Sequence, residues 1–542
     1  MEKKSVMTMT DMDSPAGTTD ALPTIEIYNT LTKKKSAMVT VKPGHVGIYL
    51  CGPTVYKPSH IGHMVGPVIF DTVKRYLEYS GWQVTWVVNI TDVDDKIIAE
   101  STARGTTMAK LATEMTADYL ANLAALGVES IDHMPKATDF IGPIITCIEG
   151  LIAKSAAYAS DGDVYFDVTQ DADYGKLTNR TVESMQGEGG LTVERKRSAA
   201  DFALWKKAKS GEPFWESPWG PGRPGWHIEC SAMSRAILGE HFDIHGGGLD
   251  LIFPHHENEI AQSESLHNCP MATYWMHNGL MQAAGASGKV GGRARDAAIG
   301  SEASSQDAAQ QAASQAATKI SKSTGAEPFK NLLERHRPEA IRMLLLSTHY
   351  RSPIHFGEEA LSESARAMEA FERLFARCQR VTGLSFYTLP LQNRRQGNAT
   401  VAAAGVETQA LREKFLAAMD DDFNTAVGIA TLFDFVRVVN KHIDQQGLEK
   451  SPSDVARTLL DAMLLVLREL TGILGLFVKE PEATRSSADQ ATVGKLMELV
   501  IEIRARARAG KDFATADLVR AKLTEAGITL EDRPDGTHWT QK

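Results

Sequence analysis

A strand, a helix and a second strand follow one another near the beginning of the chain, and this order constrains the fold more than any other feature. Residues 46–50 form an apolar run, residues 65–80 have helical character, and residues 84–90 are rich in β-branched and aromatic side chains. Apolar runs of this kind are typical of buried strands. A strand–helix–strand unit of this length pairs its strands in parallel. The sequence therefore predicts an α/β fold around a parallel sheet.

Length and composition limit the class of protein. The chain has 542 residues, enough for about three or four domains. Hydrophobic residues make up 43% and charged residues 23%, which excludes a collagen-like, coiled-coil or wholly disordered chain. The net charge of −10 by itself argues mildly against nucleic-acid binding, because nucleic-acid-binding domains are usually basic.

The five cysteines, the N-terminus and the hydropathy indicate a cellular compartment. The cysteines are far apart and odd in number, unlike a disulfide framework. The first residues lack a signal-peptide pattern, and no apolar run approaches the ~20 residues that span a bilayer. We therefore expect a reduced, cytoplasmic protein with no membrane contact.

Two short motifs lie on either side of the α/β core. His60-Ile61-Gly62-His63 lies between the first strand and its helix, where ligands bind at the carboxyl ends of strands and phosphates favour helix N-termini. The segment Lys319-Ile320-Ser321-Lys322-Ser323 can close on a polyphosphate and neutralise its charge. Taken singly, the first motif is also compatible with a surface turn and the second with a solvated basic linker.

Residues with metal-binding side chains indicate a third site. Cys51 ends the first strand, Cys230 lies in a second α/β region, and His255 and Glu259 are four residues apart, so these two share a face of any helix there. Cysteine, histidine and carboxylate side chains are all zinc ligands. The spacing alone leaves open whether His255 or His256 takes part, and whether the cysteines are only buried core residues.

The motif at residues 60–63, followed later in the chain by the motif at residues 319–323, resembles the HIGH and KMSKS signatures of class I aminoacyl-tRNA synthetases. Ile320 takes the place of the methionine in the second signature. Longer segments resemble one family of that class, the cysteinyl-tRNA synthetases. His63 is followed by Met64 and Val65, where the family usually has a small residue and then arginine. The resemblance spans nearly the whole chain through residues 51–56, 89–96, 225–233, 250–262, 274–279, 420–425 and 511–539.

The resemblance implies an enzyme that activates L-cysteine with ATP to cysteinyl-adenylate and transfers it to the terminal adenosine of tRNA(Cys). Magnesium would accompany ATP, and one zinc ion per chain would select the substrate thiolate. The implied zinc ligands are Cys51, Cys230, His255 and Glu259. The implied catalytic residues are His60, His63, Lys319 and Lys322, and the implied ATP-binding residues are His60, Gly62, His63 and Lys322. The implied cysteine-binding residues are Gly52, Thr91 and Trp226.

Zinc would solve a selectivity problem that the pocket's shape cannot. Serine has nearly the shape of cysteine, and a pocket built on size rejects such an isostere by ~10² at most. Zinc binds a soft thiolate far better than a hydroxyl. Coordination of the substrate to zinc would therefore distinguish cysteine from serine in a single binding step. Residues 127–220 are too few for the large editing insertions of related enzymes.

Three acidic residues after the second strand have two interpretations. Asp92, Asp94 and Asp95 either orient the substrate amine or form a turn that caps the next helix. We expect a structural role for at least one of them.

The C-terminal residues bear on tRNA binding. Arg504, Arg508 and Lys511 are spaced to form one basic helical stripe, and Trp539 can stack on an unpaired base. A solvated helix and a capping tryptophan are the alternative. A tRNA would bind to local basic stripes of this kind, whatever the net charge of the whole chain. Because such binding is electrostatic, we expect it to weaken as the salt concentration rises.

The fold class implied is a Rossmann-like parallel-sheet catalytic core split by a connective insertion, then an α-helical bundle and a small C-terminal α+β unit. We expect a neutral role for the low-complexity insertion, although it could instead tether the lysine loop. The predicted domains begin with a flexible extension (1–22). The catalytic domain has two halves (23–125 and 221–281), which the connective insertion (126–220) separates. After them come the low-complexity insertion (282–318), a KMSKS-like loop with a stem-contact region (319–360), the helical bundle (361–479) and an anticodon-binding unit (491–542).

Two other functions compete with this one. A ligase that joins activated cysteine to a sugar amine would share the core but lack the C-terminal region. A zinc-dependent, tRNA-binding regulator would lack catalysis, and the intact motifs argue against it. We expect a monomer whose partners are tRNA(Cys), ATP and L-cysteine.

Overall fold

The computed structural model describes residues 22–179, 195–283, 327–392, 394–395, 399–450, 453–481, 487–533 and 536–541. Nearly all of the predicted extension (1–22) and of the low-complexity insertion (282–318) therefore lies outside the described residues. Lys319 and Lys322 lie outside them as well.

A four-stranded parallel sheet forms the centre of the first part of the chain. Its strands are β3 (His45–Leu50), β4 (Gln83–Val88), β9 (Phe242–Gly248) and β10 (Ala272–Asn278), in the order β10-β9-β3-β4. Every neighbouring pair is parallel. The predicted strand–helix–strand unit is confirmed as β3, α1 (Gly62–Tyr79) and β4.

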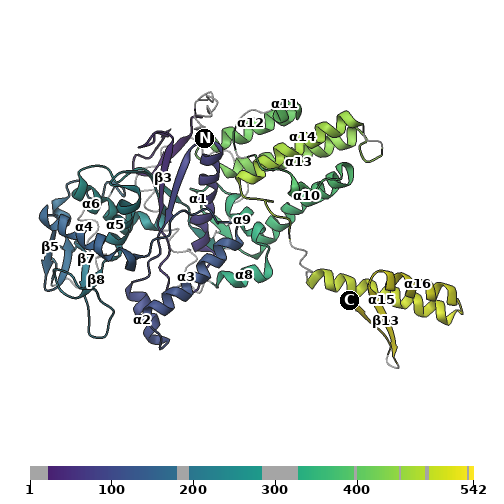
Figure 1. Ribbon diagram of the computed structural model, residues 1–542, viewed down its shortest axis with the longest axis horizontal. Helices are drawn as coiled ribbons and strands as arrows, with labels where there is room; N and C mark the ends of the chain where they lie inside the picture. The colour runs from purple at the N-terminus through teal and green to yellow at the C-terminus, as the bar shows by residue number, and fades with distance from the viewer. Residues whose placement is uncertain are drawn as a thin grey trace, which may run out of the picture. The chain divides into compact units, whose positions relative to one another are not determined.

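The two faces of the sheet are covered by different helices (Figure 1). Ile48 and Leu50 of β3 belong to the core that includes α1, whereas Tyr49 packs with Met233 of α5 (Trp226–Leu238). Successive side chains of a strand point to opposite faces, so a strand buried on both faces is apolar throughout. This explains why residues 46–50 show no polar alternation.

A second, antiparallel sheet lies between the two halves of the parallel sheet in sequence. Its strands β5 (Ala157–Ser160), β6 (Asp163–Phe166), β7 (Phe202–Lys207) and β8 (Gly222–Pro224) pair in sequence order. Their core includes Ile144 and Ile148 of α4 (Ile141–Ala153). The connections leading to it contain α2 (Asp95–Ala103) and α3 (Met108–Ala125), and α6 (Glu257–His267) lies between β9 and β10.

Helices dominate the chain after β10. The predicted helical bundle is confirmed, and Met463, Leu464 and Leu467 of its helix α14 (Asp454–Ile473) are buried, as the periodicity indicated. Two small strand pairs accompany the core: β1 (Glu26–Asn29) with β2 (Lys34–Ala37), and β11 (Met281–Ala283) with β12 (Ile354–Phe356). The helices are α8 (Phe329–Arg335), α9 (Pro338–Leu346), α10 (Glu358–Thr382), α11 (Ala399–Ala403), α12 (Val406–Asp420), α13 (Thr425–Gln445) and α14 (Asp454–Ile473).

Buried polar contacts attach α1 to the bundle. Tyr76 donates to Asp420 on α12 at 2.6 Å, and Tyr79 donates to Glu469 on α14 at 2.6 Å. Arg412 donates to the same Glu469 and to the Tyr79 hydroxyl. The helix that begins at Gly62 is therefore fixed to the bundle at its other end.

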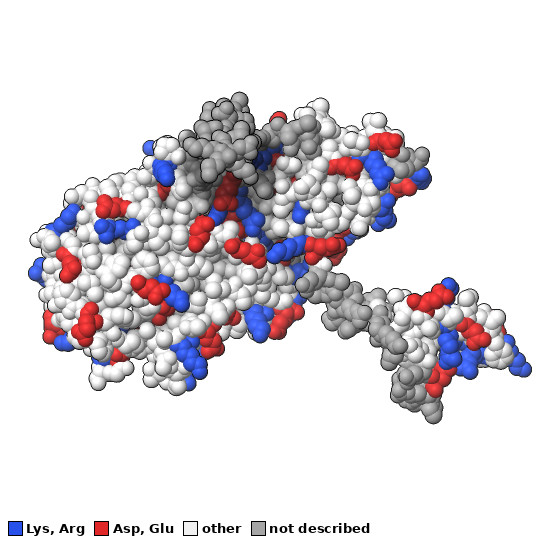
Figure 2. Space-filling model, viewed as in Figure 1, with Lys and Arg blue, Asp and Glu red and all other residues white. Residues whose placement is uncertain are grey.

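The chain divides into two compact units, of which the second begins at Lys479. This unit contains α15 (Ser487–Ala509), α16 (Phe513–Glu525) and the antiparallel hairpin of β13 (Ile528–Arg533) and β14 (Gly536–Gln541). It is the α+β unit that the fold class included. On the face shown in Figure 2, acidic and basic side chains are interspersed over each unit. Among the described residues, no helix has the length and apolar character to cross a membrane.

A buried ion pair provides a test of how the first unit is held together. Arg342 on α9 is 1% exposed and donates to Asp71 on α1 at 2.5 Å, to the carbonyl of Leu474 and to the carbonyl of Leu126. Removal of one partner leaves a buried charge uncompensated, which costs about 3–5 kcal/mol. We predict that Asp71→Ala lowers the free energy of unfolding by about this amount, measured by denaturant titration at pH 7. Asp434→Ala, which removes more exposed pairs with Lys414 and Arg437, should cost about 1 kcal/mol or less.

The same pair predicts a dependence on pH. Burial raises the pKa of Asp71, but Arg342 and Arg75 outweigh it and hold the pKa below its ordinary value. A lowered pKa in the folded state stabilises the fold above the unfolded-state pKa of about 3.9, and this contribution disappears as the pH falls through the folded-state value. The stability difference between the native protein and Asp71→Ala should therefore shrink below about pH 4. A difference that stayed constant down to pH 2 would contradict this assignment.

Candidate active site

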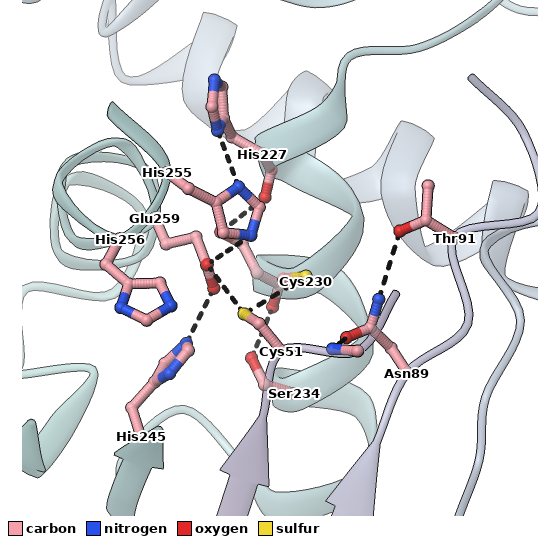
Figure 3. A network of polar contacts seen from close by, with 12 residues as sticks. Cys51, Asn89, Thr91, His227, Cys230, Ser234, His245, His255, His256 and Glu259 are labelled. Carbon is pink, nitrogen blue, oxygen red and sulfur yellow. Dashed lines mark hydrogen bonds and ion pairs between the residues drawn. The ribbon is translucent and has the colours of Figure 1, made fainter. Parts of the chain in front are cut away.

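The carboxyl end of β3 carries the first of four metal-binding side chains. Cys51 follows β3 directly, and its N–H donates to the carbonyl of Gly246 on β9 at 3.1 Å. Cys230 lies one turn into α5, and His255 and Glu259 come from the segment that enters α6. Three segments that are far apart in the sequence therefore supply the four side chains, all at the carboxyl edge of the parallel sheet (Figure 3).

The four donors form one compact group. One ligand atom from each of Cys51, Cys230, His255 and Glu259 lies within 4.8 Å of the others. The two Sγ atoms are 3.9 Å apart, Cys51 Sγ is 3.5 Å from Glu259 Oε1, and His255 Nε2 is 3.0 Å from the same oxygen. Two thiols, an imidazole and a carboxylate are a donor set that suits zinc, so the residues fit the metal that the sequence implied.

The structure separates the two neighbouring histidines that the spacing left open. His255 lies with Cys230, whereas His256 belongs to an overlapping group with His245, Cys51 and Glu259. His256 Nδ1 is 2.8 Å from His277 Nε2.

Electrostatic interactions favour the charged forms of three of these groups. Burial raises the pKa of the Cys230 thiol, but Cys51 and His255 lower it to about 6. Burial also raises the pKa of Glu259, and His245 and His255 bring it down to about 2. Burial lowers the pKa of His255, but Glu259 and Cys230 raise it to about 10. A thiolate and a carboxylate thus hold a proton on His255, in the place where a divalent cation would replace it.

Two further histidines support the group and escaped the sequence analysis. His227 Nδ1 is 2.9 Å from His255 Nδ1, and His245 Nε2 is 2.9 Å from Glu259 Oε2. Partners of this kind orient metal ligands. The available signals were a histidine three residues before Cys230 and a histidine in the middle of the segment that forms β9.

Trp226 lies against this group. Its indole stacks on the His255 ring with centroids 4.2 Å apart, and the residue is 36% exposed. A cavity of about 350 Å³ opens beside it, lined also by His227, Phe202 and Lys206. The cavity exposes aromatic surface next to the group of donors.

Asn89 and Thr91 lie near Cys51 (Figure 3), and Asn89 is hydrogen-bonded to both Gly52 and Thr91. Gly52 N–H donates to Asn89 Oδ1 at 2.8 Å, and Asn89 Nδ2 donates to Thr91 Oγ1 at 3.3 Å. A Cβ at position 52 would lie 1.7 Å from the Asn89 carbonyl oxygen. The close approach of the two strand ends therefore requires glycine there.

The three acidic residues after β4 all have structural partners. Asp92 accepts from Thr138 N–H at 3.0 Å and from its hydroxyl at 2.6 Å. Asp94 caps α2 by accepting from the Lys96 N–H at 2.8 Å, and Asp95 pairs with Lys206 and Arg223. The expectation that at least one is structural is confirmed by Asp94.

His60 and His63 meet at the start of α1. Their ring centroids are 3.8 Å apart, His60 N–H donates to His63 Nδ1 at 3.0 Å, and Gly62 N–H donates to His60 Nδ1 at 3.1 Å. The two rings thus share one side of the helix start. Met64 and Val65, where the sequence departs from the family pattern, are both buried in the core.

Comparisons with known proteins identify the family. A family model for the class I (C) tRNA synthetase catalytic domain matches residues 37–287, and one for the DALR domain matches residues 414–478. A cysteine–tRNA ligase of Symbiobacterium thermophilum is 42% identical over 520 residues, which cover 95% of this chain and 99% of that protein. One of Geobacter sulfurreducens is 41% identical over 96% of this chain and all of that protein.

The chain belongs to the cysteine–tRNA ligase family.

Membership of this family makes the chain a class I aminoacyl-tRNA synthetase, an enzyme of tRNA aminoacylation. Its fold is similar to that of methionyl-tRNA synthetase from Mycobacterium tuberculosis, solved with methionyl-adenylate, with a TM-score of 0.54 at 15% identity. That match covers 80% of this chain and 91% of the other. At this identity the likeness concerns the fold alone.

The C-terminal unit of this ligase arranges its basic residues differently from the predicted stripe. Helix α15 ends at Ala509, and Lys511 lies beyond it in a turn with φ of 60°. Arg504 is 5% exposed and donates to both carboxylate oxygens of Asp532 at 2.8 Å, while Arg508 reaches the same residue at 3.2 Å. The prediction of one continuous stripe of the three residues is therefore wrong. Helix α15 ends before Lys511, and Arg504 and Arg508 both form ion pairs with Asp532. Trp539 lies on β14 opposite Leu530.

The close approach at Gly52 yields a prediction. Gly52→Ala should push the ends of β3 and β4 apart, because its Cβ overlaps the Asn89 carbonyl, and should cost about 1–3 kcal/mol. The measurements are denaturant unfolding and the KM for cysteine, which should rise.

Gly47→Ala, within the preceding strand β3, is the matched control. Its Cβ would meet its nearest neighbour at 3.5 Å, an ordinary contact. An equal loss of stability and an equal rise in KM in both variants would refute a special requirement at position 52.

Proposed function

We propose that this enzyme ligates L-cysteine to tRNA(Cys) in two steps, with zinc selecting the substrate thiolate. The observation that carries the proposal is the compact group of half-buried Cys51 and buried Cys230, His255 and Glu259 at the carboxyl edge of the sheet. Relatives at 41–42% identity over nearly their whole length are named cysteine–tRNA ligases. The site and the family thus point to the same amino acid.

Cys51, Cys230, His255 and Glu259 are the residues that would hold zinc. When bound, zinc would coordinate the thiolate of the substrate and so distinguish cysteine from serine. His227 and His245 contact His255 and Glu259 through their ring nitrogens, and they keep these two side chains oriented. Trp226, stacked on His255, covers the side of the group next to the cavity and excludes water from the bound side chain.

In the first step, the cysteine carboxylate attacks the α-phosphate of ATP, so that cysteinyl-adenylate forms and pyrophosphate leaves. His60 and His63 lie at the N-terminus of α1, whose dipole favours phosphate. Together with Lys319 and Lys322, they stabilise the charge that develops on the phosphates. Magnesium accompanies ATP. Positioning and electrostatics suffice for this step, and no general base is needed.

In the second step, the 2′-hydroxyl of the terminal adenosine of the tRNA attacks the carbonyl carbon of the adenylate, and AMP leaves. The bundle contains the DALR match, and the C-terminal unit offers Arg508, Lys511 and Trp539. We assign tRNA contacts to these residues. Arg504 supports the unit through Asp532.

Substitution of one thiol tests the metal site. We predict that Cys230→Ser binds zinc at least about tenfold more weakly, because a hydroxyl replaces a thiolate ligand. The readout is the zinc-to-protein ratio after dialysis against a chelator. Cys378→Ser removes a buried cysteine of the bundle core and should leave the ratio unchanged. Equal zinc retention in both variants would remove Cys230 from the ligand set.

Pyrophosphate exchange tests the activity and separates the alternatives. We predict exchange that depends on cysteine, with serine disfavoured by more than ~10², the limit for discrimination by shape, and charging of tRNA(Cys) by the same preparation. Zinc removal should abolish most of the preference for cysteine. Exchange without charging would favour a cysteine ligase acting on another amine, and tRNA binding without exchange would favour a regulator.

A further inference from the structure

Ser59, the residue immediately before the His60 motif, is connected to two elements that are far apart in sequence. Its N–H and its hydroxyl both donate to Asp118 Oδ2 on α3, at 2.9 and 2.7 Å. Asn122, one turn further along α3, donates its Nδ2 to the Ser59 hydroxyl at 2.7 Å. The hydroxyl is thus both a donor and an acceptor, in a residue that is only 5% exposed.

The carbonyl of Ser59 has a different partner. It accepts from the N–H of Phe329, the first residue of α8, at 2.7 Å. The first N–H groups of a helix have no partner within the helix, so Ser59 satisfies one of them. Phe329 comes seven residues after Lys322 in the sequence. Helix α8, the first described helix after the lysine segment, is therefore hydrogen-bonded at its first residue to the residue that precedes His60.

The geometry of the histidine pair depends on this backbone. His60 N–H, on the peptide bond that Ser59 forms, donates to His63 Nδ1, and His60 Nδ1 accepts from Gly62 N–H. A shift of Ser59 therefore moves the His60 backbone and, through these bonds, both rings. Displacement of a catalytic group by about 1 Å can cost ~10²-fold in rate.

We infer that Asp118 and Ser59 are positioning residues for adenylate formation. They keep the histidine motif and the start of α8 in a fixed position relative to each other. The inference rests on the proposed function of His60 and His63 toward ATP. Cys51 and Gly52 begin the same β3–α1 connection, eight and seven residues before Ser59, but they are held by Gly246 on β9 and by Asn89 rather than by α3. Loss of the Asp118 contacts should therefore act on ATP and leave cysteine binding in place.

The test is steady-state pyrophosphate exchange with Asp118→Ala and Ser59→Ala. We expect kcat/KM for ATP to fall about tenfold to a hundredfold, while KM for cysteine stays within about twofold and zinc content is unchanged. Asp118→Asn keeps one acceptor oxygen toward Ser59 and should fall between the native protein and Asp118→Ala. This graded variant keeps the inference testable even if Asp118→Ala folds poorly.

Asp167→Ala is the matched control. Asp167 accepts from the N–H and the hydroxyl of Thr169 at 3.2 and 2.5 Å, the same pair of bonds in the connection after β6. It should lower the melting temperature without changing the ratio of ATP to cysteine parameters. The inference is overturned if the Asp118 variants match the native enzyme, or if they and Asp167→Ala impair both substrates equally. Absence of exchange in the native enzyme would instead overturn the proposed function.

Discussion

Parallel pairing of β3 with β9 is the constraint on which the active site depends. It brings the carboxyl ends of two strands from separate halves of the chain to one edge, where Cys51 continues the pairing through the Gly246 carbonyl. Helices α5 and α6, which flank β9 in sequence, then supply Cys230 and Glu259 to the same edge. An antiparallel arrangement would send these ends to opposite edges of the sheet, and the donors could not meet.

Burial and mutual charge stabilisation act together at this edge. Desolvation by itself disfavours each charged group, yet the thiolate of Cys230, the carboxylate of Glu259 and the protonated His255 compensate one another. Cys230 and Glu259 already favour their deprotonated forms, whereas burial raises the pKa of Cys51 and the two anions keep a proton on His255, so a divalent cation would bind with release of protons. His227 and His245 contact His255 and Glu259 through their ring nitrogens and so restrict the orientation of these two side chains.

Helix α1 links this edge to the rest of the first unit. Its N-terminus carries the histidine pair, its middle is held by Asp71 to Arg342, and its last turns are held by Tyr76 and Tyr79 to the bundle. The helix therefore connects the end that carries the histidine pair with the elements matched by the DALR domain. Rigid elements of this kind are suited to hold a site in a fixed geometry.

The sequence by itself determined the local strand–helix–strand order, the chemical types of the ligands and, through the family resemblance, the four residues at one site. These depend on short-range periodicity and on side-chain chemistry, which a single chain displays directly. Tertiary structure decided that His227 and His245 support the group, that Asp94 caps a helix, and that Asp532 holds Arg504. Each of these outcomes is a contact whose geometry depends on backbone placement of a few ångströms, and residue spacing carries no such information.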